Sequence, residues 1–264
     1  MNRRAYFAWL DELVGWATAH PTVVGLVAVG STAATDRQPD EFSDHDLFVV
    51  TQRGAATGLR SDLSWLPESR RIVMVHNETE HGRGVVYEDG HLVEVAVFDD
   101  DEIGLVNLNA YRVLVDQTDL EPRLAAITDR TAAAAMANDA DGTYRFQTFI
   151  EQLIVGLNRC ARGEVLSANQ RIRGDAATAL VSLLGDQLPS EHRRQLDNLD
   201  PHRRFEHAHP ELGQQITAAL DADLHTAASS MLAIAERHLG GRVAVATPAI
   251  FGAAKTVIAS TTSP

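Results

Sequence analysis

Hydrophobic positions along the chain follow two different patterns, which meet near residue 118. Before that point, apolar and often β-branched residues come in short runs between polar loops, a pattern typical of buried strands. Such runs cover residues 23–29, 45–51, 71–77, 85–87, 91–98 and 111–116. Residues 2–19 instead repeat apolar side chains at helical spacing, and Pro21 ends this helix. The first part is therefore expected to be a mixed α/β unit built on a small sheet.

Beyond residue 118 the sequence is rich in Ala, Leu and Arg, and no β-branched run interrupts its helical spacing. The expected helices cover residues 121–138, 142–162, 167–184 and 212–239. They predict an all-helical second domain, arranged as a bundle. The last residues are small, low in charge and rich in Thr and Ala, which is typical of a loosely held tail. We thus expect an α+β chain with domains at residues 1–118 and 119–245 and a flexible tail at 246–264.

Composition narrows the class of protein. A chain of 264 residues is long enough for one large domain or two modest ones. Its one cysteine, Cys160, cannot build a disulfide framework, so a reducing cytoplasm is the expected location. No run reaches the roughly 20 apolar residues of a transmembrane helix, and the start of the chain has no signal-peptide pattern. No membrane partner is expected.

The net charge of −13 bears on the partners of the protein. Nonspecific nucleic-acid binding depends on Lys and Arg that neutralise phosphates, so this charge disfavours a nucleic-acid partner. A cationic small molecule suits an acidic protein better. Lys255 is the only lysine. Phosphate contacts in the body of the fold must therefore come from arginine, a backbone N–H or a hydroxyl.

Candidate chemistry lies where the first predicted strand ends and the second begins. The first strand runs into Gly30 and Ser31, and the second opens with the acidic pair Asp44 and Asp46. Alternate residues of a strand point to the same face, so these carboxylates are expected together, about 7 Å apart along the chain. Two like charges at that spacing repel each other unless a cation lies between them. Oxygen ligands favour Mg²⁺ when substrate phosphates complete its shell.

Three further residues complete this candidate site. Gly30 allows close approach of a phosphate to the backbone, and Ser31 adds a hydroxyl and an N–H group. Glu94 is a charged residue in the middle of a strongly apolar strand, and a carboxylate buried there is costly unless it is paired or bound to metal. We expect it to be a third acid on a neighbouring strand. His45 faces the other side of its strand and is expected to be a packed, structural histidine.

The pattern of an apolar strand, Gly-Ser, a loop, an Asp-x-Asp strand and a third acid resembles the nucleotidyltransferase superfamily with the DNA polymerase β-type palm. The resemblance covers residues 23–98. The segment DEFSDHDL at residues 40–47 and the helical second half are similar to small antibiotic nucleotidyltransferases, the aminoglycoside adenylyltransferases and lincosamide nucleotidyltransferases. The resemblance implies a nucleotidyltransferase palm in the first domain and a helical domain that binds substrate and nucleotide.

The resemblance also implies roles for the site residues. Asp44 and Asp46 would hold Mg²⁺ and the triphosphate of ATP or another NTP, next to Gly30 and Ser31. Glu94 would complete the metal site and deprotonate the hydroxyl of an aminoglycoside or lincosamide, which receives AMP as pyrophosphate leaves. Some relatives bind phosphates through lysines that are absent here. Arginines of the second domain are expected to substitute, and the candidates are Arg145, Arg159, Arg162, Arg171 and Arg173.

Two functions of other classes stay open. The same core could adenylylate a protein or RNA partner, as in toxin–antitoxin modules, although the net charge argues against RNA. It could also be a nucleotide sensor without catalysis, although all three acids of the pattern are present. The identity of the acceptor, the nucleotide preferred and the choice between monomer and homodimer stay open as well.

Overall fold

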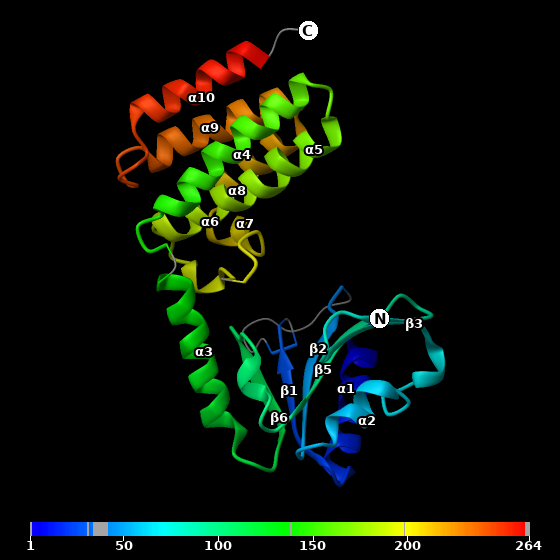
Figure 1. Cartoon of the computed structure of the whole chain (residues 1–264). Coiled ribbons are helices and arrows are strands. Elements are labelled where there is room, and N and C mark those ends of the chain that lie inside the picture. Colours follow the sequence, from blue (N-terminus) through cyan, green and yellow to red (C-terminus); the bar gives the residue numbers. More distant parts are fainter. Residues whose placement is uncertain (1, 31, 34–41, 138, 198, 262–264) are drawn as a thin grey trace. The chain divides into compact units, whose positions relative to one another are not determined.

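The computed structural model describes residues 2–30, 32–33, 42–137, 139–197 and 199–261 (Figure 1). The chain divides into two compact units, Met1–Ala133 and Ala134–Pro264. The first combines a six-stranded sheet with helices, and the described part of the second is helical apart from one isolated bridge between Gly240 and Val243. The predicted α+β class is therefore confirmed.

The sheet of the first unit has the strand order β3-β4-β5-β2-β1-β6. Its strands are β1 (Val23–Val29), β2 (His45–Thr51), β3 (Ile72–Asn77), β4 (Gly82–Tyr87), β5 (Leu92–Asp99) and β6 (Tyr111–Asp116). Only β2 and β5 pair in parallel, and the other four pairs are antiparallel. Every strand that the apolar runs predicted is present.

Helices cover both faces of this sheet (Figure 1). On one face lie α1 (Arg3–Ala19) and α2 (Ala56–Ser61), with side chains such as Leu13 and Ala56 in a core that includes Leu47. On the other face, α3 (Leu120–Ala137) packs Leu120 against the apolar side chains of β1, β2 and β5. Both faces of the sheet are covered by apolar side chains of helices, so the strands are apolar at nearly every position.

The border between the two units lies later than the sequence predicted. Composition changes near residue 118, but Leu120, Leu124 and Ile127 of α3 are buried against the sheet, so most of this helix belongs to the first unit. The composition of this segment indicates that it forms a helix, but not which unit the helix packs against. The apolar face of α3 packs against the sheet, so the helix belongs mostly to the first unit.

The second unit is built around α4 (Thr143–Ala161). The elements that follow are α5 (Val165–Asn169), the π-helix η3 (Gln170–Ala176), α6 (Ala177–Gln187), the short 3₁₀ helix η4 (Arg193–Gln195), α7 (Phe205–Ala208), α8 (Pro210–Asp221), α9 (Leu224–Leu239) and α10 (Pro248–Thr261). The single helix expected at residues 212–239 is two helices. Asp223 separates them, because its carboxylate accepts the N–H groups of His225 and Thr226, each at 3.0 Å, and so caps α9.

Helix α10 occupies most of the segment that was expected to be a loose tail. Phe251 is 2% exposed and packs edge-to-face on Phe146, with 5.6 Å between the ring centroids. The small apolar residues that looked like a tail are therefore a helix face that closes the core of the second unit. No helix in the described part of the chain is long and apolar enough to cross a membrane.

Candidate active site

Asp46 and Glu94 are direct partners in the parallel ladder of β2 and β5. Paired residues of adjacent strands point to the same face of a sheet, so the two side chains are neighbours although 48 residues separate them in the sequence. His45 and Val93, one position earlier on each strand, point to the opposite face and are fully buried below α1. A slip of one residue in this register would move one carboxylate to the wrong face.

Glu94 is exposed, whereas Asp46 is half-buried. The expectation of a buried Glu94 carboxylate was wrong. Its partner on the other side, Gly84 of β4, has no side chain that could cover it. The Glu94 side chain is therefore exposed to solvent, and no cost of burying a charge needs to be explained.

Glu78 contributes another carboxylate to this face, which the sequence analysis missed. It lies in the connection between β3 and β4, and a β-carbon built on Gly84 would lie 2.8 Å from its Oε1 atom. The absence of a side chain at Gly84 thus makes room for Glu78 beside the position paired with Glu94. Only the pairing of the two strands brings this acid close, so no local pattern in the sequence could reveal it.

Gly30 lies directly against the Asp46 side chain. Its φ angle is +53°, and a β-carbon there would lie 2.2 Å from Asp46 Oδ2 and 2.9 Å from Cγ. Only glycine combines this backbone conformation with this space. The absence of a side chain at Gly30 makes room for the Asp46 carboxylate. Contact of the Gly30 backbone with a phosphate stays a prediction. Ser31 lies outside the described residues.

A buried hydroxyl, Thr32, joins the elements that carry the candidate site. Its Oγ1 atom accepts the N–H of Asp46 at 3.0 Å and lies 2.9 Å from the Tyr6 hydroxyl of α1. Both hydroxyls also lie within hydrogen-bond distance of the Asp44 carbonyl oxygen, at 3.1 and 3.3 Å. Thr32 is fully buried. This network holds the start of β2 against the end of β1, and with it the position of half-buried Asp44.

Burial keeps the Tyr6 hydroxyl of this network protonated. Burial raises the pKa of Tyr6 to about 12, and the charges of Asp46 and Asp44 act in the same direction. At neutral pH the Tyr6 hydroxyl is therefore a hydrogen-bond donor, and its role is to hold the network in place. The Tyr6 hydroxyl therefore does not serve as a base that takes a proton from another group near neutral pH.

Arg112 is a cation that the sequence analysis overlooked. It lies on β6 opposite Ala28 and donates from Nη2 to the Thr32 carbonyl oxygen at 3.2 Å. Its buried Nε atom has no hydrogen-bond partner among the described residues. The position of this arginine next to the loop that follows β1 depends on strand pairing, so its sequence neighbours carry no signal of it.

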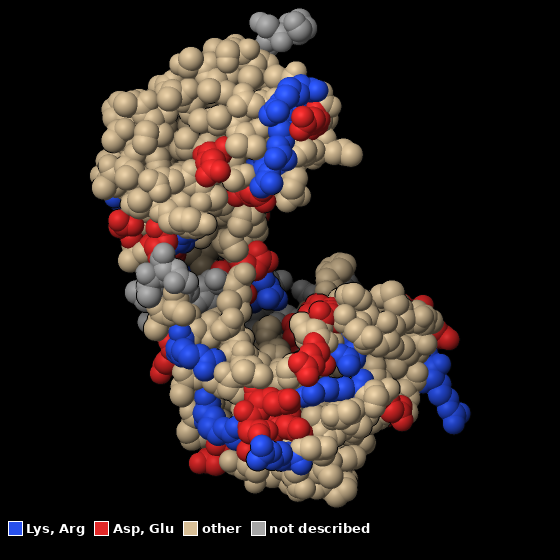
Figure 2. Space-filling model, viewed as in Figure 1, with Lys and Arg blue, Asp and Glu red and all other residues tan. Residues whose placement is uncertain are grey.

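The arginines expected to bind phosphate make contacts within the second unit. Arg145 pairs with Asp139 at 2.8 Å and with Asp186, and Arg171 pairs with Asp175 at 2.7 Å. The other three donate to oxygens of the same unit: Arg159 to Ser167, Arg162 to Asn158 and Arg173 to Ala222. Acidic and basic side chains lie next to one another on the visible face of each unit (Figure 2).

His45 is the structural histidine that its position predicted. Its Nε2 atom lies 3.2 Å from the Tyr6 carbonyl oxygen, which only accepts, so Nε2 carries the proton. The Nδ1 atom of neutral His45 therefore accepts from His91 Nε2, at 2.7 Å. Burial lowers the pKa of His45 to about 3, with a further contribution from His91, and burial also lowers the pKa of His91. Both rings are neutral at pH 7.

Asp44, Asp46 and Glu94 are the candidate metal ligands of this face. Among the described residues, no group of three or more His, Cys, Asp or Glu side chains is gathered closely enough to hold a metal. Mg²⁺ takes one or two protein carboxylates when substrate phosphates supply the other oxygens. The paired Asp46 and Glu94 can supply this number, and Asp44 lies just before β2. The residues fit Mg²⁺ bound together with a nucleotide.

No protein-family model matches the sequence, and no curated protein matches it significantly. Among solved structures, an aminoglycoside 6-adenyltransferase from Bacillus subtilis matches with 10% identity and a TM-score of 0.39, over 96% of this chain and 97% of the other. A nucleotidyltransferase-like protein from Exiguobacterium sibiricum matches with 13% identity and a TM-score of 0.32, over 88% of this chain and 77% of the other. The assignment of the site rests on the residues described above.

Proposed function

We propose that the chain is a Mg²⁺-dependent nucleotidyltransferase that moves AMP from ATP to a hydroxyl of a small molecule and releases pyrophosphate. The observation that carries this proposal is the in-register pair of Asp46 and Glu94, with Gly30 packed against the Asp46 carboxylate. Two acids on one face of a sheet, one half-buried and one open to solvent, suit a metal ligand and a proton acceptor.

In this function Asp44 and Asp46 would hold Mg²⁺ together with the triphosphate, and Glu94 lies beside Asp46 on the same face of the sheet. Bound Mg²⁺ supplies charge neutralisation on the triphosphate and on the departing pyrophosphate. The exposed Glu94 carboxylate takes the proton of the acceptor hydroxyl. The acceptor oxygen forms a bond to the α-phosphorus, and the bond from the α-phosphorus to the pyrophosphate oxygen breaks. Ser31 and the backbone at Gly30 contact the phosphates.

The proposed acceptor is an aminoglycoside or a lincosamide, so the protein would confer antibiotic resistance by modification of the drug. Both classes carry amines that are cationic near neutral pH, and the net charge of −13 favours such ligands. The motif resemblance of residues 40–47 to antibiotic nucleotidyltransferases supports the same choice.

Pyrophosphate release from Mg-ATP across a panel of aminoglycosides and lincosamides tests this function. We expect release that depends on one acceptor and that falls below detection in Asp46→Asn. Glu88→Gln is the control, because it removes an exposed acid from the turn between β4 and β5. Release that survives in Asp46→Asn would refute the assigned site. If no panel member supports release but labelled ATP marks a protein or RNA band in a lysate, the acceptor is a macromolecule.

A further inference from the structure

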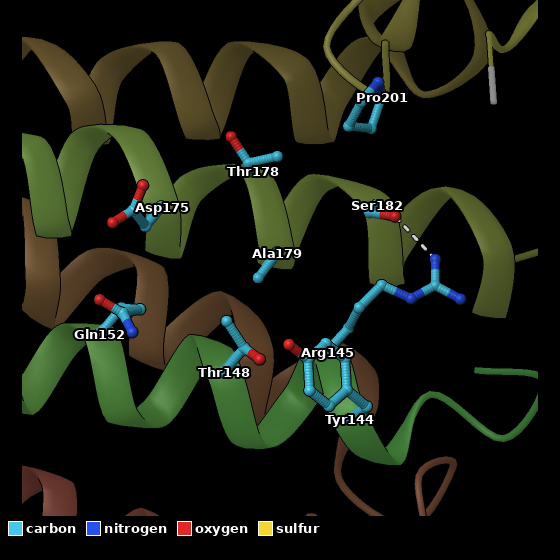
Figure 3. Close-up of a pocket in the computed structure, with 9 residues that line it drawn as sticks. All are labelled: Tyr144, Arg145, Thr148, Gln152, Asp175, Thr178, Ala179, Ser182 and Pro201. Atoms are coloured by element: carbon cyan, nitrogen blue, oxygen red, sulfur yellow. Dashed lines mark hydrogen bonds between the residues drawn. The ribbon is translucent and has the colours of Figure 1, made fainter. Parts of the chain in front are cut away.

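A pocket of about 410 Å³ lies in the second unit, between α4 and the continuous helix formed by η3 and α6 (Figure 3). Its volume is at the lower end of the roughly 300–1,000 Å³ of small-molecule sites. Contacts along the two helices show that they run antiparallel, because Gly156 meets Ile172 at one end and Arg145 meets Ser182 at the other. All residues of the pocket belong to this unit.

Local sequence explains why the helices leave a pocket. At Gly156 a β-carbon would lie 2.5 Å from the Ile172 side chain, so the helices touch closely there. Towards the start of α4 the facing residues include the small Thr148 and Ala179, which cannot fill the space between the two backbones. The segment facing Gln152 is π-helical, a rare conformation that is frequent at functional sites.

The charged groups at the pocket are already compensated. Asp175 accepts from Arg171 at 2.7 Å, and Arg145 is paired with two aspartates and also donates to Ser182 at 2.7 Å. A cationic ligand would have to compete with Arg171 for the Asp175 carboxylate, and an anionic ligand with aspartates for Arg145. The pocket therefore favours an uncharged ligand.

Neutral hydrogen-bonding groups remain on both walls. Within the described part of the chain, the Thr148 hydroxyl and the Gln152 amide nitrogen have no hydrogen-bond partner, while the Gln152 oxygen accepts from Arg171 at 3.1 Å. On the α6 wall, the exposed Thr178 lies 2.9 Å from His202 Nε2 and keeps further hydrogen-bonding capacity. The pocket thus offers donors and acceptors from two opposite sides.

An aromatic ring completes the pocket. Tyr144 is 68% exposed although it is a large hydrophobic residue, and it belongs to the pocket lining (Figure 3). Its face is a flat apolar surface beside polar walls. A ligand that matches this arrangement has one apolar face and hydroxyls that point outward on several sides. A flat nucleobase would satisfy the ring but not the hydroxyls of both walls.

We infer that this pocket binds an uncharged, hydroxyl-rich six-membered ring, a pyranoside or a cyclitol. The C–H face of the ring lies against Tyr144, and its hydroxyls bond to Thr148, Gln152 and Thr178. This site goes beyond the proposed transfer reaction, because it needs neither Mg²⁺ nor nucleotide nor any residue of the sheet. Its test is therefore independent of the outcome for the transferase.

Saturation-transfer NMR on the full chain, without Mg²⁺ or nucleotide, tests the inference. The neutral probes are methyl β-glucopyranoside and myo-inositol, and the comparison probes are adenosine and the diamine 2-deoxystreptamine. We expect saturation of the ring C–H protons for at least one neutral probe. We expect the same signal in Asp46→Asn, which leaves the pocket intact.

Two pocket variants and one control locate the binding. Thr148→Val keeps the shape of the side chain and should weaken binding about fivefold, the value of one hydrogen bond. Tyr144→Ala should weaken it at least as much, and Thr256→Val, an exposed position on α10, should leave it unchanged. The inference would be overturned if neither neutral probe gave a signal, or if only adenosine bound. It would also be overturned if the protein preferred the diamine, or if both pocket variants bound as well as the wild type.

Discussion

The Gly30 backbone and the Asp46 carboxylate share a space that admits no further carbon atom: a β-carbon on Gly30 would lie 2.2 Å from Asp46 Oδ2. The φ angle of Gly30, +53°, adds a second reason for glycine at this position. These two constraints have different consequences, since strain in the backbone affects stability while displacement of the carboxylate affects the candidate active site.

Gly30→Ala is therefore expected to abolish most of the acceptor-dependent pyrophosphate release, by about 10²-fold or more, because Asp46 must move. Its cost in unfolding free energy should include about 1 kcal/mol from the positive φ angle. Gly54→Ala is the matched control, since Gly54 has a φ of +82° but nothing within 4 Å of an added β-carbon. Equal losses of activity in both variants would contradict a specific role for Gly30. Initial rates and urea unfolding measure the two effects.

Glu94→Gln should lower kcat by roughly 10²–10⁴-fold, the usual contribution of a general base. The amide keeps the size of the side chain but cannot take a proton, so binding of ATP should change less than turnover. Steady-state kinetics with Glu88→Gln as control measure this difference. A variant that raises only KM would indicate that Glu94 serves in binding and that another group accepts the proton.

Thr32→Val should lower the free energy of unfolding by about 1–3 kcal/mol, because the N–H of Asp46 loses its acceptor in a buried place. Thr32→Ser retains the hydroxyl and should recover most of the loss. Thermal and urea unfolding of both variants check this, and activity should follow the same order. Equal stability of the two variants would show that the hydroxyl does not hold β2 in place.

The buried pair of His45 and His91 should make the protein less stable in mild acid. The folded-state pKa of His45, about 3, lies below its ordinary value of 6.5, so the unfolded chain binds more protons between these values. The stability that depends on neutral His45 is thus fully present above pH 6.5 and is lost as the pH falls towards 3. His45 contributes up to about 1.4 kcal/mol per pH unit in this window, and the lowered pKa of His91 acts in the same direction.

Urea unfolding at pH 7.5, 6.5 and 5.5 measures this slope. His91→Gln can still donate to His45 Nδ1 but does not titrate, so its slope should be smaller than that of the wild type. The carboxylates are common to both proteins, so the difference between the slopes reports the titration of His91 together with its effect on His45. Identical slopes, or a stability that does not change between pH 7.5 and 5.5, would refute this account.

Phe251→Ala should cost about 3–5 kcal/mol, as large-to-small changes of buried aromatic residues do. Phe251 packs on Phe146 in the core of the second unit. Lys255→Ala, on the same helix, removes only an exposed ion pair with Glu236 and should change stability by less than about 1 kcal/mol. Differential scanning calorimetry compares the two. A mild effect of Phe251→Ala would mean that α10 behaves as the tail that its composition suggests.

Local patterns were sufficient for much of the fold. Strand positions and the α+β class follow from the alternation of apolar and polar residues, which depends only on neighbours in the chain. The same alternation placed His45 on the buried face, opposite Asp46. Helix ends were predicted less well. The Asp223 cap is a local signal that composition alone does not record, and the burial of Phe251 depends on its contact with Phe146, which is distant in the sequence.

The tertiary structure decided what the candidate site contains. Parallel pairing of β2 with β5 sets Asp46 beside Glu94, and antiparallel pairing of β5 with β4 leaves Glu94 open next to Gly84. Thr32 joins the site through its contacts with Asp46 and Tyr6, and Arg112 through a contact with Thr32 that spans 80 residues of sequence. The sequence by itself determined which residue types are present and which face of a strand they share. Which strands become neighbours, and in what register, depends on burying both faces of the sheet at once, and that is a property of the whole unit.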